Sequence, residues 1–164
     1  MEWKQKDSLP VEMNSHHIVR IGNNIYCGGG FTGKVSTDRL VFKYKYKKDK
    51  WSQLPVCPSL HFGLAQLDEK LVTVGGKDID ELTPIKHVYI FEEDSHTWEN
   101  FNKPLCEARC SPCVFACKSV LVASGGICRW ICDYEHSVRT NTVEVFQNSQ
   151  WHASVPLPFA TNAL

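Results

Sequence analysis

The stretch IYCGGG, residues 25–30, places three consecutive glycines at the end of an apolar run. A glycine-rich turn can cradle a phosphate, or it can be one copy of a structural repeat. The stretches LVTVGG (71–76) and LVASGG (121–126) decide between these alternatives, because both also end in Gly-Gly after a short apolar run. The Gly-Gly pairs recur at steps of 46 and 50 residues. Such a period indicates a repeat rather than an isolated nucleotide loop.

Tryptophan recurs in phase with the glycines, and a Leu-Pro or Pro-Leu pair follows each copy: Trp3, Trp51, Trp98 and Trp151. Each unit also divides into four short runs with strand character. In the second unit these runs are 62–67, 71–76, 87–91 and 97–101. Short β-branched and aromatic runs separated by polar turns predict strands, and no convincing helical pattern interrupts them. The sequence therefore predicts an antiparallel all-β architecture.

An apolar run that ends in Gly-Gly, an aromatic pair such as Tyr89 and Phe91, and a Trp shortly afterwards resemble the kelch repeat. The resemblance implies a kelch-type β-propeller with three four-stranded antiparallel blades in an incomplete ring. The units are expected at approximately 11–55, 56–104 and 105–158, with residues 1–10 as the fourth strand of a preceding blade. The glycines are then structural. A phosphate loop would need a following helix and a Lys-Ser/Thr pair, which residues 31–38 do not supply convincingly.

Three blades do not close a ring, because propellers close with about 4 to 8 blades. The favoured interpretation is a part of a larger propeller, and the alternative is two copies that pair into one ring. Open blade edges expose unpaired backbone groups, so we expect self-association through them.

The composition narrows the classes of partner. The 18 basic and 18 acidic residues give a formal charge of zero, which argues against nucleic acid and against an anionic membrane surface as partners. No apolar run reaches the roughly 18 residues of a spanning helix. The start of the chain is polar and does not read as a signal peptide, so the eight cysteines are expected to be reduced thiols of a cytoplasmic protein.

Six cysteines are closely spaced between residues 106 and 132, and such spacing can bind zinc or an iron–sulfur cluster. The repeat alignment favours another interpretation, since it places most of these cysteines at small or apolar positions. Cys117, for example, aligns with Leu67 and Ile21 and is expected in the core. We therefore predict no metal and no cofactor, with Cys128 and Cys132 as the more exposed pair.

A basic run over residues 43–50 is expected to form a solvated hairpin, with an electrostatic docking patch as the alternative. The main binding surface is expected on two sets of loops, which the resemblance brings to one face. One set follows each Gly-Gly pair (31–38, 77–86 and 127–141), and the other precedes each first strand (10–15, 55–61 and 104–111). The residues predicted to bind a partner are Arg109, Lys77, Asp78, Arg129, Trp130 and Tyr134.

Arg109 occupies the position where kelch repeats often carry an arginine, whereas Ser59 and Met13 stand there in the other units. The resemblance implies a non-catalytic protein–protein interaction module, and use as a substrate-recruiting adaptor of a cullin ubiquitin ligase is open. The alternative is an enzyme domain on a kelch-like propeller, either an oxidase or a glycosidase. These would need copper ligands or a carboxylate pair, and neither is visible as a motif.

Overall fold

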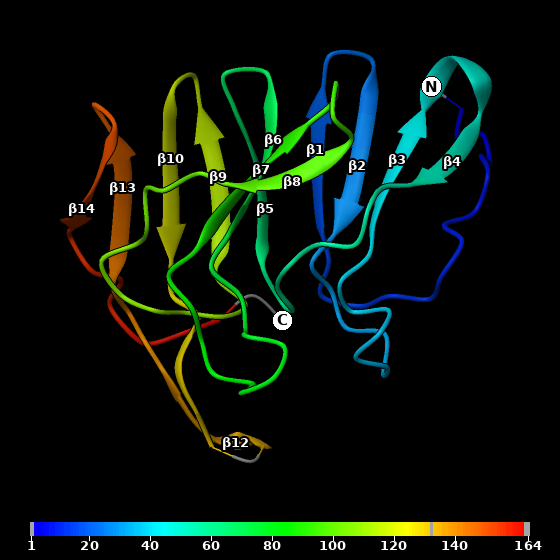
Figure 1. Ribbon diagram of the computed structural model, residues 1–164. Helices are drawn as coiled ribbons and strands as arrows, with labels where there is room; N and C mark the ends of the chain where they lie inside the picture. Colours follow the sequence, from blue (N-terminus) through cyan, green and yellow to red (C-terminus); the bar gives the residue numbers. More distant parts are fainter. Residues whose placement is uncertain (1, 132, 163–164) are drawn as a thin grey trace.

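Three four-stranded antiparallel sheets lie side by side in the computed structural model, which describes residues 2–131 and 133–162, without the side chains of 131–135 (Figure 1). Blade 1 contains β1 (His17–Ile21), β2 (Asn24–Gly28), β3 (Val41–Lys45) and β4 (Lys50–Gln53). Blade 2 contains β5 (Gly63–Leu67), β6 (Lys70–Val74), β7 (Val88–Glu92) and β8 (Thr97–Asn100). Blade 3 contains β9 (Cys113–Cys117), β10 (Val120–Ser124), β13 (Val143–Gln147) and β14 (Gln150–Ser154).

Three further elements lie outside the blades. β11 (Ile127–Ile131) and β12 (Asp133–Arg139) form a separate hairpin inserted in blade 3, and η1 (Tyr46–Lys48) is a single 3-10 turn. None of the helices in the described ranges is long and apolar enough to cross a membrane. The predicted all-β fold with three four-stranded blades is confirmed.

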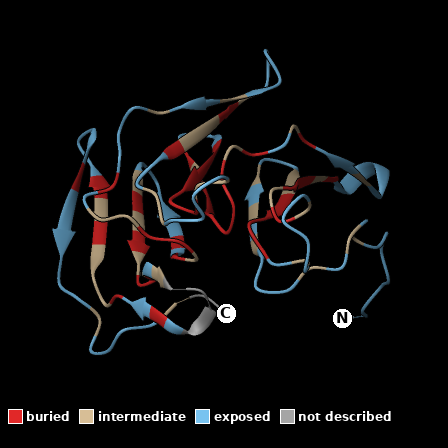
Figure 2. Cartoon of the chain, turned by 60° about the horizontal axis from the view of Figure 1, so that its bottom comes forward, coloured by how far each residue is buried: buried red, intermediate tan, exposed pale blue. Residues whose placement is uncertain are grey.

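The core consists of two layers between neighbouring blades. One layer joins blades 1 and 2 and includes Tyr26, Phe62 and Leu64. The other joins blades 2 and 3 and includes Val72 and Leu121. Blade 2 is therefore packed on both faces, whereas the outermost strand of blade 3, β14, is largely exposed (Figure 2). Burial on both faces explains why the strands of blade 2 read as nearly continuous apolar runs.

Each blade repeats one aromatic contact between its third and fourth strands. A Trp on the fourth strand lies directly opposite an aromatic residue on the third strand. Ring centroids are 5.0, 5.2 and 5.5 Å apart in the pairs Tyr44–Trp51, Phe91–Trp98 and Phe146–Trp151. Tilted aromatic pairs at this separation add stability beyond their buried area. The predicted equivalence of these three Trp residues on fourth strands is confirmed.

The same three Trp side chains also anchor the chain segment that leads into each blade. Each indole N–H donates to a backbone carbonyl more than 40 residues upstream, at 2.8–3.0 Å, and the acceptors are Asp7, Pro55 and Lys103. A buried Trp N–H needs such a partner. The repeat therefore fixes a hydrogen bond as well as a packing contact.

The N-terminal segment lies outside the three blades. Residues 2–10 contain no strand in the described structure, and the prediction that residues 1–10 form the fourth strand of a preceding blade stays a prediction. A fourth strand needs a third strand beside it, and the described structure places none there. Instead, Asp7 accepts the Trp51 indole N–H and donates its own N–H to Asp49. The predicted unit boundaries also stay a prediction.

The paired glycines allow the backbone of the next blade to approach closely. Gly75 has φ +64°, and a Cβ there would collide with the carbonyl oxygen of Arg109. The N–H of Gly76 donates to that same oxygen at 2.8 Å. In blade 3, the Gly126 N–H makes the equivalent bond to Thr161 at 2.7 Å. Only glycine tolerates this combination of positive φ and close approach. The Gly-Gly pairs are therefore structural parts of the repeat.

We expect Gly75→Ala to destabilise the protein by about 2–5 kcal/mol, because it adds a clash with a neighbouring backbone to the strain of a positive φ. Gly22→Ala is the matched control. Gly22 also has a positive φ of +56°, but nothing lies within 4 Å of its added Cβ. The control should cost about 1–2 kcal/mol. Equal losses for both variants in urea unfolding would contradict the close-approach account.

Trp151→Ala should cost about 3–5 kcal/mol, since Trp151 is 7% exposed and loses both its aromatic partner and its hydrogen bond. Trp3→Ala provides the control, because Trp3 is fully exposed. Thermal unfolding monitored by circular dichroism measures both. An unchanged melting temperature for Trp151→Ala would show that the repeated Trp does not support the blade.

Candidate functional site

The loops after the Gly-Gly pairs gather at one end of the blades, at the bottom of Figure 1. The first residue of each loop is paired with the segment that precedes the first strand of the same blade. These bridges join Phe31 to Asn14, Lys77 to Leu60 and Ile127 to Cys110. We call this surface the Gly-Gly end. Segments from all three blades carry side chains of varied chemistry at this end.

The sequence predicted a loop at residues 127–141, but the structure forms regular strands there. Most of the expected loop 127–141 forms the hairpin of β11 and β12, which projects from the Gly-Gly end (Figure 1). Its strand pairing contains two register shifts. The residues CRWI and YEHSV alternate only weakly in polarity, so a periodic strand signal was hidden there. The hairpin presents Arg129, His136 and Val138 on its exposed surface.

Arg109, which the sequence predicts to bind a partner, is buried within blade 3, and its part in partner binding stays a prediction. Its side chain is fully buried and donates to the carbonyls of Gly125 and Thr142 and to the carboxylate of Glu144, the last at 2.7 Å. Glu107 lies 3.2 Å away on the exposed side. Acceptors meet both terminal nitrogens of the guanidinium, which makes its burial possible, whereas Nε is buried without a partner among the described residues. Sequence reasoning missed Glu144, which has no partner nearby in the chain.

The Arg109–Glu144 pair replaces apolar residues of blade 1. Glu144 lies opposite Ala123 in the β10–β13 ladder, and Phe42 takes the same place opposite Cys27 in blade 1. In the repeat alignment, Met13 corresponds to Arg109. A buried ion pair in blade 3 thus occupies the place that a methionine and a phenylalanine occupy in blade 1.

Arg109→Met alone should cost about 3–5 kcal/mol, because Glu144 would keep a buried charge without its counter-ion. The double variant Arg109→Met/Glu144→Phe, which copies blade 1, should recover most of that loss. A double-mutant cycle in urea measures the coupling. Additive losses from the two substitutions would contradict the assignment of a mutually dependent pair.

Among the other residues predicted to bind a partner, Lys77 and Trp130 are in contact at the Gly-Gly end, and Asp78 and Arg129 are next to them in the chain. Lys77 is only 4% exposed, and its ammonium lies 2.9 Å from the centroid of the Trp130 ring. Trp130 is half-buried and Arg129 is exposed. Asp78 accepts two backbone N–H bonds within its own loop, which lower the pKa of its carboxyl group. The Tyr134 side chain lies outside the described residues.

Three residues that the sequence did not single out for binding adjoin Lys77. The Asp38 carboxylate is buried and accepts the backbone and hydroxyl hydrogens of Thr32 at 2.7 and 2.6 Å. His61 lies 3.7 Å from Asp38, and Phe31 stacks on its ring. Burial lowers the pKa of His61, although the nearby Asp38 carboxylate opposes the shift. Asp38 and Phe31 come from blade 1 and His61 from blade 2, so no local pattern marks them as neighbours.

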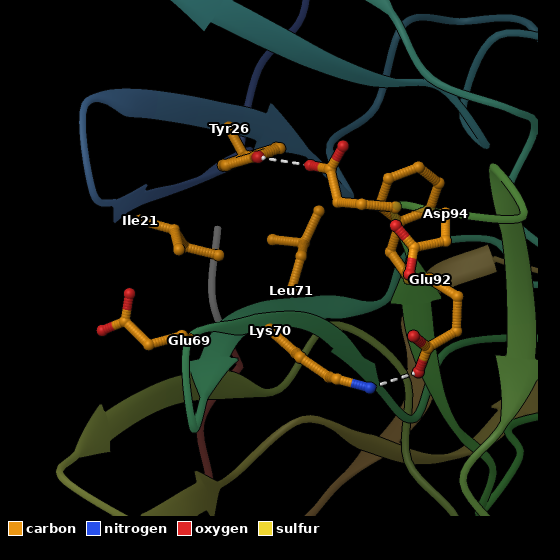
Figure 3. A pocket seen from close by; sticks show the side chains of 9 residues that line it. Ile21, Tyr26, Glu69, Lys70, Leu71, Glu92 and Asp94 are labelled. Atoms are coloured by element: carbon orange, nitrogen blue, oxygen red, sulfur yellow. Dashed lines mark hydrogen bonds and ion pairs between the residues drawn. The ribbon is translucent and has the colours of Figure 1, made fainter.

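A hollow of about 240 Å³ lies between blades 1 and 2, at the end of the blades opposite the Gly-Gly end (Figure 3). Two of the four carboxylates that line it, those of Glu92 and Glu93, are paired with lysines. Glu93 accepts from Tyr26 at 2.9 Å and from Lys43 at 2.7 Å, and Glu92 binds Lys70 at 2.6 Å. Lys43 is therefore held inside the molecule rather than offered to a partner, which weakens the docking-patch interpretation of the basic run.

The cysteines divide by the face of the sheet on which they lie. Cys110 is fully buried as expected, but Cys117 is exposed, so its predicted place in the core is wrong. On β9, Cys113, Phe115 and Cys117 face away from the buried Val114, on the side of blade 3 that no other described sheet covers. Cys128 is half-buried, and Cys132 lies outside the described residues. Self-association through this open side stays a prediction.

Within the described side chains, no group of three or more His, Cys, Asp or Glu residues is arranged to hold a metal ion. The cysteine spacing therefore does not assemble into a ligand set among these residues. Cys106, Cys113 and Cys117 are exposed, whereas burial raises the pKa of the Cys110 thiol to about 12.

Comparison with known protein families identifies the type of repeat. Residues 14–55 match the family model described as Kelch motif. The chain is built of kelch repeats. Kelch-like protein 41b of Danio rerio is 30% identical over 105 residues, which cover 63% of this chain and 17% of that protein. Kelch-like protein 41a of the same species is 30% identical over 128 residues, which cover 77% of this chain and 21% of that protein.

Kelch-like protein 41 of Homo sapiens is 28% identical over 100 residues and is matched over 16% of its length. The kelch chain thus spans about a fifth or less of the curated relatives that it matches. A solved structure described as "Structure of YjhT" superposes with a TM-score of 0.76 at 14% identity, over 98% of this chain and 57% of that one. This likeness shows a shared fold.

Proposed function

We propose that this chain is a non-catalytic interaction module that binds a protein partner through the Gly-Gly end. The observation that carries the proposal is the exposure of large apolar side chains on all three loops there. Phe31 and Val35 are 42% and 54% exposed, Leu82 is 40% exposed, and Val138 on the hairpin is 45% exposed. Apolar residues exposed together on one surface and rimmed by charge are typical of protein docking sites.

The blades supply the rigidity that such a surface needs. Every strand of the three blades is paired with at least one neighbour, and the two inter-blade core layers fix the sheets against one another. The loops are free of the packing demand that keeps the strands alike, so they carry the residues that differ between units. Arg129 and Trp130 belong to the residue types that dominate binding energy at protein interfaces.

A finer part of the proposal concerns the cellular role. We infer that the module recruits a substrate to a cullin ubiquitin ligase in the cytoplasm. The support is its likeness to kelch-repeat proteins, some of which act as such substrate receptors, and the free thiols of its described cysteines.

Trp130→Ala or Arg129→Ala should weaken binding of a purified partner by about 2 kcal/mol, roughly 30-fold, if these residues are hot spots. Lys45→Ala is the control, because Lys45 is exposed on β3, away from the Gly-Gly end. Isothermal titration measures all three affinities. Normal binding by both hairpin variants together with lost binding by Lys45→Ala would place the partner elsewhere and refute the proposal.

A further inference from the structure

The end of the blades opposite the Gly-Gly end carries unlike charges on neighbouring blades. We call it the turn end, because it contains the turns between the third and fourth strands, 46–49, 93–96 and 148–149 (Figure 1). An aromatic residue and its opposite Trp flank each turn, so the three turns are equivalent. Blade 1 places lysines there, blade 2 places carboxylates, and blade 3 places Asn148 and Ser149. Strand packing therefore does not require charge at these turns.

The carboxylates of blade 2 surround the hollow between blades 1 and 2 (Figure 3). Its walls are apolar, and four carboxylates and one lysine also line it. Two of the carboxylates are paired with lysines of the chain. The other two, Glu69 and Asp94, are exposed and form no ion pair with another described residue; Glu69 accepts a hydrogen bond from Gln66 at 3.3 Å. The two lie on opposite sides of the hollow in Figure 3 and leave it with an excess of negative charge.

Lys43 shows what kind of side chain such a surface holds. Its ammonium lies 2.7 Å from the Glu93 carboxylate and 5.4 Å from the centroid of the Tyr26 ring, and its side chain is only 14% exposed. A lysine places its four-carbon stem on apolar surface while its head group reaches a carboxylate. Glu69 and Asp94 offer the same combination to a second lysine from outside the chain.

Blade 1 presents lysines of this kind on its own turn. Lys47 and Lys48 belong to η1, are exposed, and form no ion pair among the described residues. Together with Tyr46 they line a hollow of about 180 Å³. Asp49, the one acidic residue of this turn, is paired with Lys6 at 3.5 Å. The turn of blade 1 is therefore as clearly basic as the turn of blade 2 is acidic.

We propose that two copies of this chain pair through their turn ends, with Lys47 and Lys48 of each copy against the acidic hollow of the other. Because the basic and acidic turns belong to neighbouring blades, one two-fold axis between them makes both contacts at once. The same rotation brings Asp94 of each copy to the lysine-lined hollow of the other. The pairing is independent of partner binding at the Gly-Gly end.

A second copy fits this end better than an unrelated basic or acidic protein. A partner of one charge would be attracted to one turn and repelled by the next, whereas a second copy matches both. Single exposed ion pairs contribute little, so the pairing needs all of these contacts together. We expect a weak dimer, with a dissociation constant on the order of 100 µM.

Sedimentation velocity of the unchanged chain is the first measurement. The chain should dimerise at about 50 mM salt, and the dissociation constant should rise about tenfold at about 500 mM salt, because exposed charges are then screened. Association through the open apolar side of blade 3 would not weaken with salt. The salt dependence therefore separates the two modes of self-association.

A charge swap is the sharper measurement. The variants Lys47→Glu/Lys48→Glu and Glu69→Lys/Asp94→Lys should each be monomeric, because like charges replace both attractive contacts. An equimolar mixture of the two variants should form a heterodimer. In that heterodimer the reversed turn of one variant meets the reversed hollow of the other, and the second contact is unchanged. Restored association also shows that both variants are folded.

The matched control is Lys34→Glu/Lys103→Glu, which reverses two exposed lysines outside the turn end and should dimerise like the unchanged chain. Three results would overturn the inference: an unchanged chain that is monomeric at low salt, a mixture of the two variants that stays monomeric, or association that survives both charge reversals. None of these results bears on partner binding by the hairpin variants, so the proposed function is tested separately.

Discussion

The fold depends on two hydrogen bonds, each of which joins the Gly-Gly turn of a blade to the chain segment that follows that blade. The N–H groups of Gly76 and Gly126 donate to the carbonyls of Arg109 and Thr161, where the next segment of chain arrives. These bonds form only because the neighbouring glycines carry no Cβ to hold the backbones apart. The spacing between blades, and with it the apolar layers between them, follows from this approach. The loops that emerge from the same glycines therefore start from fixed positions.

The three blades share the residues that hold their strands together, but they differ at other positions. The shared residues support stability, and the differing ones are available for recognition. Trp151 and its counterparts repeat because each fastens a fourth strand to the chain upstream. The Arg109–Glu144 pair occupies a place that Phe42 helps to fill elsewhere, so one structural demand is met by two kinds of chemistry. At the Gly-Gly end, strand packing does not require the same residue type in every blade. There Lys77, Asp38 and His61 keep charge or polarity in buried positions that packing alone would fill with apolar groups.

The periodic features could be predicted from the sequence, because strand packing requires the same residue types in every unit. Gly75, Trp98 and the aromatic residues opposite the Trp side chains belong to this group. The site could not be predicted to the same degree. Arg109 looked like an exposed loop residue because its partner Glu144 lies 35 positions away in the chain. Asp38 and His61 meet across two blades, and Cys117 is exposed because its side of the last sheet lies uncovered. Such contacts arise only when the sheets assemble.

Amide hydrogen exchange at Gly76 and Gly126 tests the central claim most directly. If their hydrogen bonds fix the spacing between blades, both amides should exchange as slowly as those of the central strands β6 and β10, and all should open together on adding denaturant. The Gly22 amide, in the turn between β1 and β2, provides the fast reference. Exchange of Gly76 and Gly126 at the rate of Gly22, while the strands stay protected, would show that the blades are held together without these bonds and would contradict the account.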